Sequence, residues 1–156
     1  HKNIEIIGKA LGEKTQKLDL NIFPENSNLV GHNSFIENET LKKNDGFEKV
    51  EVQVLSADEW IKDNKIEKID FLKVDIEGFE YSFFKGASEL LKLQPVIFFE
   101  HSSSRIHDLG IDESEFNKIL SNYTCYQILK DGLLEYKFDG EMHPYASDIL
   151  AIPKGQ

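Results

Sequence analysis

The sequence contains a single cysteine, Cys125, and only one methionine and one tryptophan among its 156 residues. One cysteine excludes an internal disulfide framework and any zinc site built from several cysteines. No apolar run approaches the roughly 18 residues of a membrane-spanning helix, and no secretory signal pattern stands at the beginning of the chain. We therefore expect a soluble protein in the cytoplasm, with no transmembrane segment.

Positive charge is also scarce, because 18 Lys and Arg face 28 Asp and Glu, giving a formal net charge of −10. Nucleic-acid binding depends on clustered Lys and Arg that release counterions from phosphates. The basic residues are scattered here, so we predict no nucleic-acid partner. With 40% hydrophobic residues, the chain can bury a core, and we predict a single domain over residues 1–156.

Several catalytic motifs are absent from the sequence. It has no Gly-x-Gly dinucleotide fingerprint, no phosphate-binding loop, no Gly-x-Ser-x-Gly and no His-Glu-x-x-His. The sequence therefore gives no support for a dinucleotide-binding or phosphate-loop protein, a serine hydrolase or a zinc protease. Glu100-His101 and His107-Asp108 could chelate a cation, but their spacing matches no established ligand pattern, and we predict no metal site from them.

Apolar residues predict strands separated by helices. The run 4–7 predicts a strand, and period-2 alternation predicts strands over 17–23 and 50–54. The runs 69–76 and 95–99 are apolar on both faces, which is typical of interior strands covered by helices. The intervening residues are numerous enough for a helical crossover between parallel strands.

The remaining pattern supplies helices and a closing set of strands. Ser56-x-x-Glu59 has the spacing of a capping box and predicts a short helix. Gly86 divides the stretch before residue 95 into two short helices. A further helix opens at Asp112, and the last predicted strands cover 125–129, 133–138 and 148–152, the first two joined as a hairpin. The sequence therefore predicts an α/β fold whose open sheet is mostly parallel, with antiparallel strands at its end.

Acidic groups follow both interior strands. Asp75 and Glu77 end the first strand, and Glu100 and His101 end the second. Ligands bind beyond the carboxyl ends of strands in open α/β sheets, so we expect these four side chains at one rim. A carboxylate that ends a buried strand is costly unless it is paired or ligated. A purely structural role stays open for Glu77 and Glu80, which fall at a helix N-terminus, because helix N-termini favour carboxylates.

The sequence around these acidic residues also resembles a known protein family. Lys73-x-Asp75-x-Glu77-Gly78-x-Glu80, followed by Lys85-Gly86-Ala87 and by a strand ending in Glu100, is similar to the FkbM family of S-adenosylmethionine-dependent methyltransferases. The similarity spans about residues 3–105. It implies a Rossmann-like class I methyltransferase sheet, of which this chain holds the third strand onwards. The family's glycine-containing cofactor loop and its ribose-binding acidic residue would both precede His1.

The resemblance also implies roles for individual residues. It places Ala10 and Leu11 beside the adenine of S-adenosylmethionine, and Asp75 facing the methyl donor. Our hypothesis is an O-methyltransferase that acts on a hydroxyl of a small molecule, a sugar or a glycoconjugate. In it Asp75 serves as base or orients the hydroxyl, and Glu77, Glu100 and His101 line the acceptor pocket.

Two alternatives remain open at this point. Some small-molecule methyltransferases of this fold hold Mg²⁺ with carboxylates at these two strand ends, which Asp75 and Glu100 would supply. A second alternative is a noncatalytic, methyltransferase-derived module that binds a partner through its acidic surface.

Overall fold

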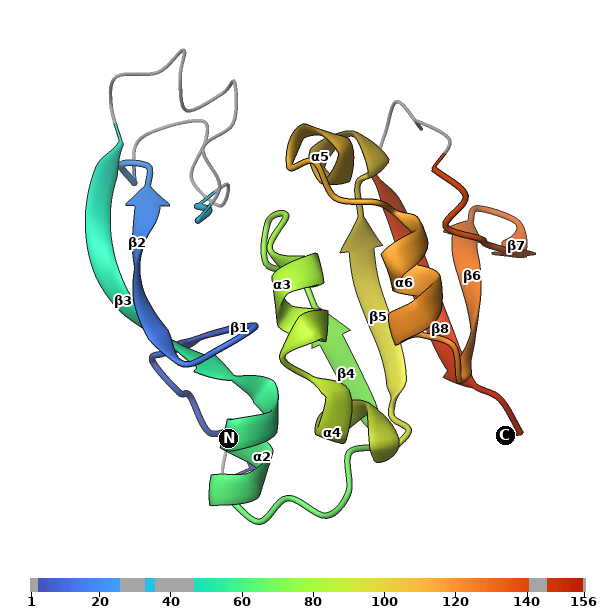
Figure 1. Ribbon diagram of the computed structural model, residues 1–156, viewed down its shortest axis with the longest axis horizontal. Helices are drawn as coiled ribbons and strands as arrows, with labels where there is room; N and C mark the ends of the chain where they lie inside the picture. Colours follow the sequence, from blue (N-terminus) through green and yellow to red (C-terminus); the bar gives the residue numbers. More distant parts are fainter. Residues whose placement is uncertain (1–2, 26–32, 36–46, 141–145, 156) are drawn as a thin grey trace.

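The computed structural model describes residues 3–25, 33–35, 47–140 and 146–155 (Figure 1). The strands and helices follow one another along the chain in this order: β1 (Ala10–Gly12), β2 (Gln16–Ile22), β3 (Glu48–Ser56), α2 (Ala57–Asp63), β4 (Phe71–Val74), α3 (Glu80–Lys85), α4 (Ser88–Lys92), β5 (Val96–His101), α5 (Ser103–Asp108), α6 (Ser114–Ile119), β6 (Tyr123–Leu129), β7 (Gly132–Glu135) and β8 (Ser147–Pro153). No helix of the described residues is long and apolar enough to cross a membrane.

The N-terminal part forms a three-stranded sheet in the order β1-β3-β2. The two strands predicted from period-2 alternation are confirmed as β2 and β3, which pair in antiparallel fashion. The strand predicted over residues 4–7 is wrong, because the first strand begins only at Ala10. Ile6 is 91% exposed. Among the described residues no strand lies beside this run to satisfy its backbone or cover its side chains.

The larger sheet has the order β4-β5-β8-β6-β7. β4 and β5 are parallel, as the crossover predicts, and β6 and β7 form the predicted hairpin. The expectation of a mostly parallel sheet is wrong. Among the described strands, only β1–β3 and β4–β5 pair in parallel. The reason is that β8 returns antiparallel between β5 and β6, a long-range pairing that no local pattern indicates.

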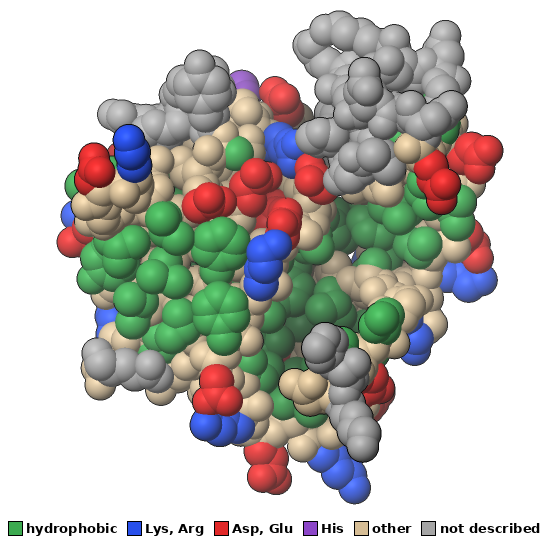
Figure 2. Space-filling model, turned by 180° about the vertical axis from the view of Figure 1, so that it is seen from behind, with side chains coloured by type: hydrophobic (Ala, Val, Ile, Leu, Met, Phe, Trp, Pro, Cys, Tyr) green, Lys and Arg blue, Asp and Glu red, His purple; other side chains and the backbone are tan. Residues whose placement is uncertain are grey.

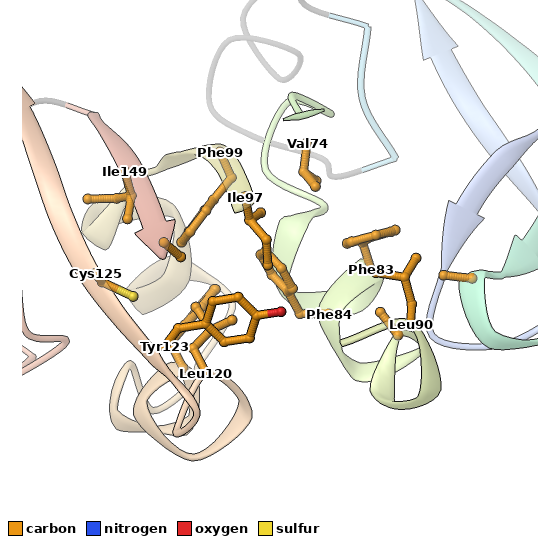
Figure 3. Packing of buried hydrophobic residues seen from close by; sticks show 14 of the residues in the cluster. Val74, Phe83, Phe84, Leu90, Ile97, Phe99, Leu120, Tyr123, Cys125 and Ile149 are labelled. Carbon is orange, nitrogen blue, oxygen red and sulfur yellow. The ribbon is translucent and has the colours of Figure 1, made fainter. Parts of the chain in front are cut away.

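Helices α3 to α6 lie on one face of the larger sheet (Figure 1). The buried side chains of β5, Ile97 and Phe99, face them. Figure 3 shows Phe84, Ile97 and Phe99 converging between the strands and the helices. Phe99 contacts Phe84 edge-on at 5.0 Å between ring centroids and stacks on Phe116 at 6.2 Å. The core therefore lies on this one side of the sheet.

The opposite face of the larger sheet is not covered by any described helix. Its apolar side chains are half-buried or exposed: Phe71, Val96, Phe98, Leu150 and Ile152. Figure 2 shows this face as a hydrophobic surface with acidic side chains along one border. The expectation that helices cover both faces is therefore wrong for the described residues, because the second apolar face of β4 and β5 is open.

The two sheets meet where β1 approaches the end of α3. The carbonyl of Gly86 accepts hydrogen bonds from the Ser56 hydroxyl, at 3.1 Å, and from the Asp58 backbone N–H, at 2.9 Å. A Cβ atom on Gly86 would lie 2.2 Å from the carbonyl oxygen of Gly12. The predicted division at Gly86 is thus confirmed, and this position excludes any larger residue.

The local signals for the helices are borne out at three places. Ser56 caps α2 by accepting a hydrogen bond from the Glu59 backbone N–H, as the capping box predicts. α3 and α4 flank Gly86, and α6 begins close to Asp112. No sequence signal predicted α5, a helix of six residues that begins two residues after β5.

Candidate active site

The turn after β4 has a specific backbone conformation. Glu77 and Gly78 both adopt positive φ, 54° and 96°. A residue with a Cβ atom is disfavoured in that region, so Glu77 is held there by its surroundings. Two side chains hold the turn: the Glu80 carboxylate accepts hydrogen bonds from the backbone N–H groups of Ile76 and Gly78, and the Ser34 hydroxyl donates to the Glu77 carbonyl at 2.8 Å.

Asp75 and Glu100 lie on the same face of neighbouring strands. Lys73 is the register partner of Phe98. Asp75 directly follows the end of β4, and Glu100 lies two residues beyond Phe98 in β5, so the two continue the same row. The Lys73 ammonium contacts the Asp75 carboxylate at 2.6 Å, which is consistent with that common side. The next strand adds Asp148, the register partner of Glu100. A row of carboxylates therefore crosses three strands at this rim.

Arg105, on α5, stands between two of these carboxylates. Its Nη2 lies 3.4 Å from Glu77 Oε2, and its Nη1 lies 4.0 Å from Glu100 Oε2. These separations exceed the roughly 2.7–2.9 Å of a tight charge-assisted hydrogen bond. All three side chains keep between a quarter and about a third of their surface exposed. Arg105 thus joins the turn after β4 to the end of β5 through loose, partly solvated contacts.

The surroundings of Glu100 raise the pKa of its carboxyl above the ordinary value. Partial burial raises the pKa of the Glu100 carboxyl, Arg105 opposes that effect, and the negative charges of Glu77, Asp75 and Asp148 raise the pKa further. A carboxylate whose pKa is raised by burial and by neighbouring charge, at the mouth of a sheet, is typical of a functional site.

His101 does not lie with these groups. It faces the helix side of β5, where its side chain is 1% exposed and contacts the Glu113 carboxylate through Nε2. Glu113 also accepts a hydrogen bond from the Ser103 hydroxyl at 3.2 Å, and the rings of Phe116 and Phe138 flank the imidazole. The alternation of β5 explains this separation, because adjacent residues of a strand point to opposite faces.

A family model described as the methyltransferase FkbM domain matches residues 6–125. The chain belongs to the FkbM methyltransferase family. No curated protein and no solved structure matches it. Family membership indicates methyltransferase activity, and methyltransferases in general use S-adenosylmethionine as the methyl donor.

The cofactor residues expected in the FkbM domain lie on β1. Leu11 lines a small pocket of about 180 Å³ together with Ile7, Lys9, Leu55 and Trp60. Ala10 pairs with Val54 and is half-buried in the strand. The pocket is mostly apolar and includes an indole ring, so the shape and polarity of its lining suit a flat heteroaromatic group such as adenine. Leu11, rather than Ala10, contributes its side chain to that pocket.

The carboxylates of the FkbM domain do not converge as a metal-ligand group. Over the residues that the structure describes, no three or more His, Cys, Asp or Glu side chains are placed to hold one ion together. Lys73 and Arg105 lie among the acidic groups instead. The charge balance at the rim is therefore set by basic side chains of the chain itself.

Sequence reasoning overlooked three residues that shape the site. Arg105 lies only five residues after Glu100, and its position beyond the predicted strand end was the available signal. Asp148 opens the last predicted strand, but its pairing with Glu100 depends on the antiparallel return of β8. Ser34 lies between residues 26–32 and 36–46, which fall outside the described residues, and no sequence signal marks it.

Proposed function

We propose that this FkbM domain transfers a methyl group from S-adenosylmethionine to a hydroxyl of a small molecule, a sugar or a glycoconjugate. The observation that carries the proposal is the common side of Asp75 and Glu100 at the carboxyl ends of two parallel strands, with Glu77 joined to Glu100 through Arg105. Ligands of open α/β sheets bind at such strand ends.

In this proposal Asp75 is the catalytic carboxylate. The donor supplies a methyl group on a positively charged sulfur, and the acceptor hydroxyl must lose its proton as the new bond forms. The Asp75 side chain is about half exposed and reaches solvent at the rim, so it can accept that proton or orient the hydroxyl.

Glu77 and Glu100 line the acceptor site in this proposal, and Arg105 orients them. Their oxygens accept hydrogen bonds from acceptor hydroxyls, while the guanidinium donates. His101 is left out of the acceptor site, because its imidazole is buried on the helix side of β5. We propose for Leu11 and its pocket the adenine-binding role, with Ala10 supporting it through the pairing with Val54.

We further propose that the two sheets belong to one Rossmann-like class I methyltransferase sheet that additional strands complete. β4 has no partner on one edge among the described strands, and Phe71 on it is 57% exposed. A solvent-exposed apolar edge invites another strand. Strands inserted between β4 and the small sheet would pair with the free edge of β4. Helices on the open face would bury Phe71.

Calorimetric titration with S-adenosylhomocysteine tests the cofactor assignment. It should be run on residues 1–156 and on a chain extended upstream of His1, because the resemblance to the family predicts the cofactor loop there. We expect the extended chain to bind the ligand more tightly than residues 1–156. Absence of binding by the extended chain would remove the methyltransferase proposal.

Conservative substitutions test the two carboxylates. Because each would contribute through proton transfer or hydroxyl orientation, Asp75→Asn and Glu100→Gln should each lower methyl transfer by about 10² or more. Asp70→Asn is the matched control, since Asp70 precedes β4, pairs with Lys68 and is largely exposed at the opposite end of the strand. Rates near that of the control would reject the assignment.

The alternative is a noncatalytic module that binds a partner. The open apolar face of the larger sheet and the acidic border beside it favour this alternative, since both resemble a recognition surface more than a closed active site. A folded, extended chain that neither binds S-adenosylhomocysteine nor transfers methyl groups would support it.

A further inference from the structure

Glu80 is a buried carboxylate that the proposed chemistry does not use. It is the first residue of α3 and is only 5% exposed. An unpaired carboxylate at such a position is costly. Glu80 must therefore obtain compensating contacts, and these contacts show what it does.

The contacts of Glu80 run backwards along the chain into the turn after β4. One oxygen, Oε1, accepts hydrogen bonds from the Ile76 N–H at 3.1 Å and from the Gly78 N–H at 3.3 Å. Both groups belong to the turn, and neither belongs to α3. The carboxylate thus fixes the backbone on both sides of Glu77.

The turn requires such fixing because of Glu77. Its φ of 54° lies in the left-handed region, which is disfavoured for a residue with a side chain. The same residue directs its carboxylate to Arg105, and its carbonyl accepts from the Ser34 hydroxyl. A relaxed turn would move Glu77 and the preceding Asp75 away from their places at the rim.

We propose that Glu80 is the positioning residue of this site, and that its buried carboxylate holds the turn 76–78 so that Asp75 and Glu77 face Glu100. This inference rests on the proposed function for its catalytic consequence. Its structural consequence, the local order of the turn, can be tested without any activity.

The titration of the Glu80 carboxyl gives a measurable signal for the order of the turn. Burial raises the pKa of the Glu80 carboxyl, while the N–H groups of Ile76, Gly78 and Glu80 itself, and the Arg105 guanidinium, act in the opposite direction. The other carboxylates of the turn are Asp75 and Glu77. Because Glu80 bonds both amides, the Ile76 and Gly78 amide protons should shift together in one titration above the ordinary Glu value of about 4.3.

The experiment is amide NMR of the 156-residue chain as wild type, Glu80→Gln and Glu80→Ala, with Glu77→Gln as control. In Glu80→Gln we expect the shared titration of the two amides to vanish, and in Glu77→Gln we expect it to persist. In Glu80→Ala hydrogen exchange at both amides should rise at least about tenfold, with β5 amides within about twofold of wild type. If Glu80→Ala does not fold, the titration in Glu80→Gln decides.

Methyl transfer provides the second readout. Glu80→Gln should lower kcat about tenfold with the KM for the methyl donor within about twofold of wild type, because the carboxylate acts through Asp75 and Glu77 rather than on the donor. A titration that persists in Glu80→Gln overturns the proposal, and so does an unchanged kcat. If the wild-type chain neither transfers methyl groups nor binds the cofactor, the proposed function is rejected instead. The amide titration then still tests the role of Glu80 in the turn.

Discussion

At the scale of single residues, Gly86 has no room for a side chain. Its carbonyl serves two donors from the α2 end of the small sheet, and its Cα faces the Gly12 carbonyl. The neighbouring atoms belong to the backbone, so they cannot rotate away as the tip of a side chain would. Glycine is therefore required here for space, since its φ of −93° is open to any residue.

Gly86→Ala should destabilise the protein by about 1–3 kcal/mol, as overpacking does when the obstruction must shift. Urea unfolding followed by circular dichroism measures this loss. Gly8→Ala is the matched control, because a Cβ there meets nothing within 4 Å, and it should change stability by less than about 0.5 kcal/mol. Equal effects of the two variants would show that the close approach at Gly86 does not exist in solution.

The sequence predicts the placement of some of these side chains but not of others. Asp75, Glu77 and Glu100 could be brought to one rim because two apolar runs with a helical crossover fix the relative direction of their strands. The side of the sheet on which His101 lies was not predicted. Adjacent residues of a strand point to opposite faces, so His101 faces away from Glu100. Its partner Glu113 lies in a different helix-forming segment, and only the tertiary structure joins them.

At the scale of elements, the His101–Glu113 contact ties β5 to the start of α6. Ser103 donates to the same carboxylate from the first turn of α5, and the Tyr136 hydroxyl lies 3.5 Å from it. Four elements or their flanking residues thus meet at one buried oxygen. Because α5 carries Arg105, this cluster also determines where the guanidinium stands relative to Glu77 and Glu100.

Glu113→Ala should cost about 3 kcal/mol of unfolding free energy, because removing one member leaves the other polar groups buried without their acceptor. Thermal or urea unfolding provides the measurement. Glu115→Ala, two residues later, removes a partly exposed carboxylate that pairs with Lys118 on the same helix, and its effect should be much smaller. A Glu113→Ala variant as stable as Glu115→Ala would show that the buried cluster contributes nothing to the fold.

Elements defined by local signals were predictable, and elements defined by distant partners were not. The capping box at Ser56 and the division at Gly86 are readable because they act within a few residues. The run 4–7 has the composition of a strand but lacks a partner among the described strands. The place of β8 between β5 and β6 depends on contacts between segments about 50 and 25 residues apart in the chain, which periodicity does not encode.

At the scale of the whole molecule, Cys125 reports on the integrity of the core. It lies on β6 beneath the helices, is buried, and has no disulfide partner. Burial raises the pKa of its thiol from 9.0 to about 12. Since the unfolded chain releases this proton at lower pH, the stability contributed by the neutral thiol is lost as pH rises from 9 towards 12.

At pH 8 the thiolate fraction should accordingly be about 10³-fold lower in the folded protein than in the unfolded chain. Thiol modification by a chromogenic disulfide reagent measures it, and we expect at least about 100-fold slower reaction in buffer than in denaturing urea. Similar rates in the two conditions would mean that the core around β6 opens readily. Since Cys125 is the sole cysteine, every modified molecule reports this one position.

The central position of β8 has a consequence for how the chain acquires its structure during translation. β5 emerges from the ribosome well before its neighbour β8. The β6–β7 hairpin also cannot join the sheet until β8 has been made. Until Ser147–Pro153 has been synthesised, the nascent chain holds two separate strand pairs with open edges, a state prone to aggregation. Chaperone dependence of this protein should therefore be greatest for ribosome-bound chains that end before residue 147.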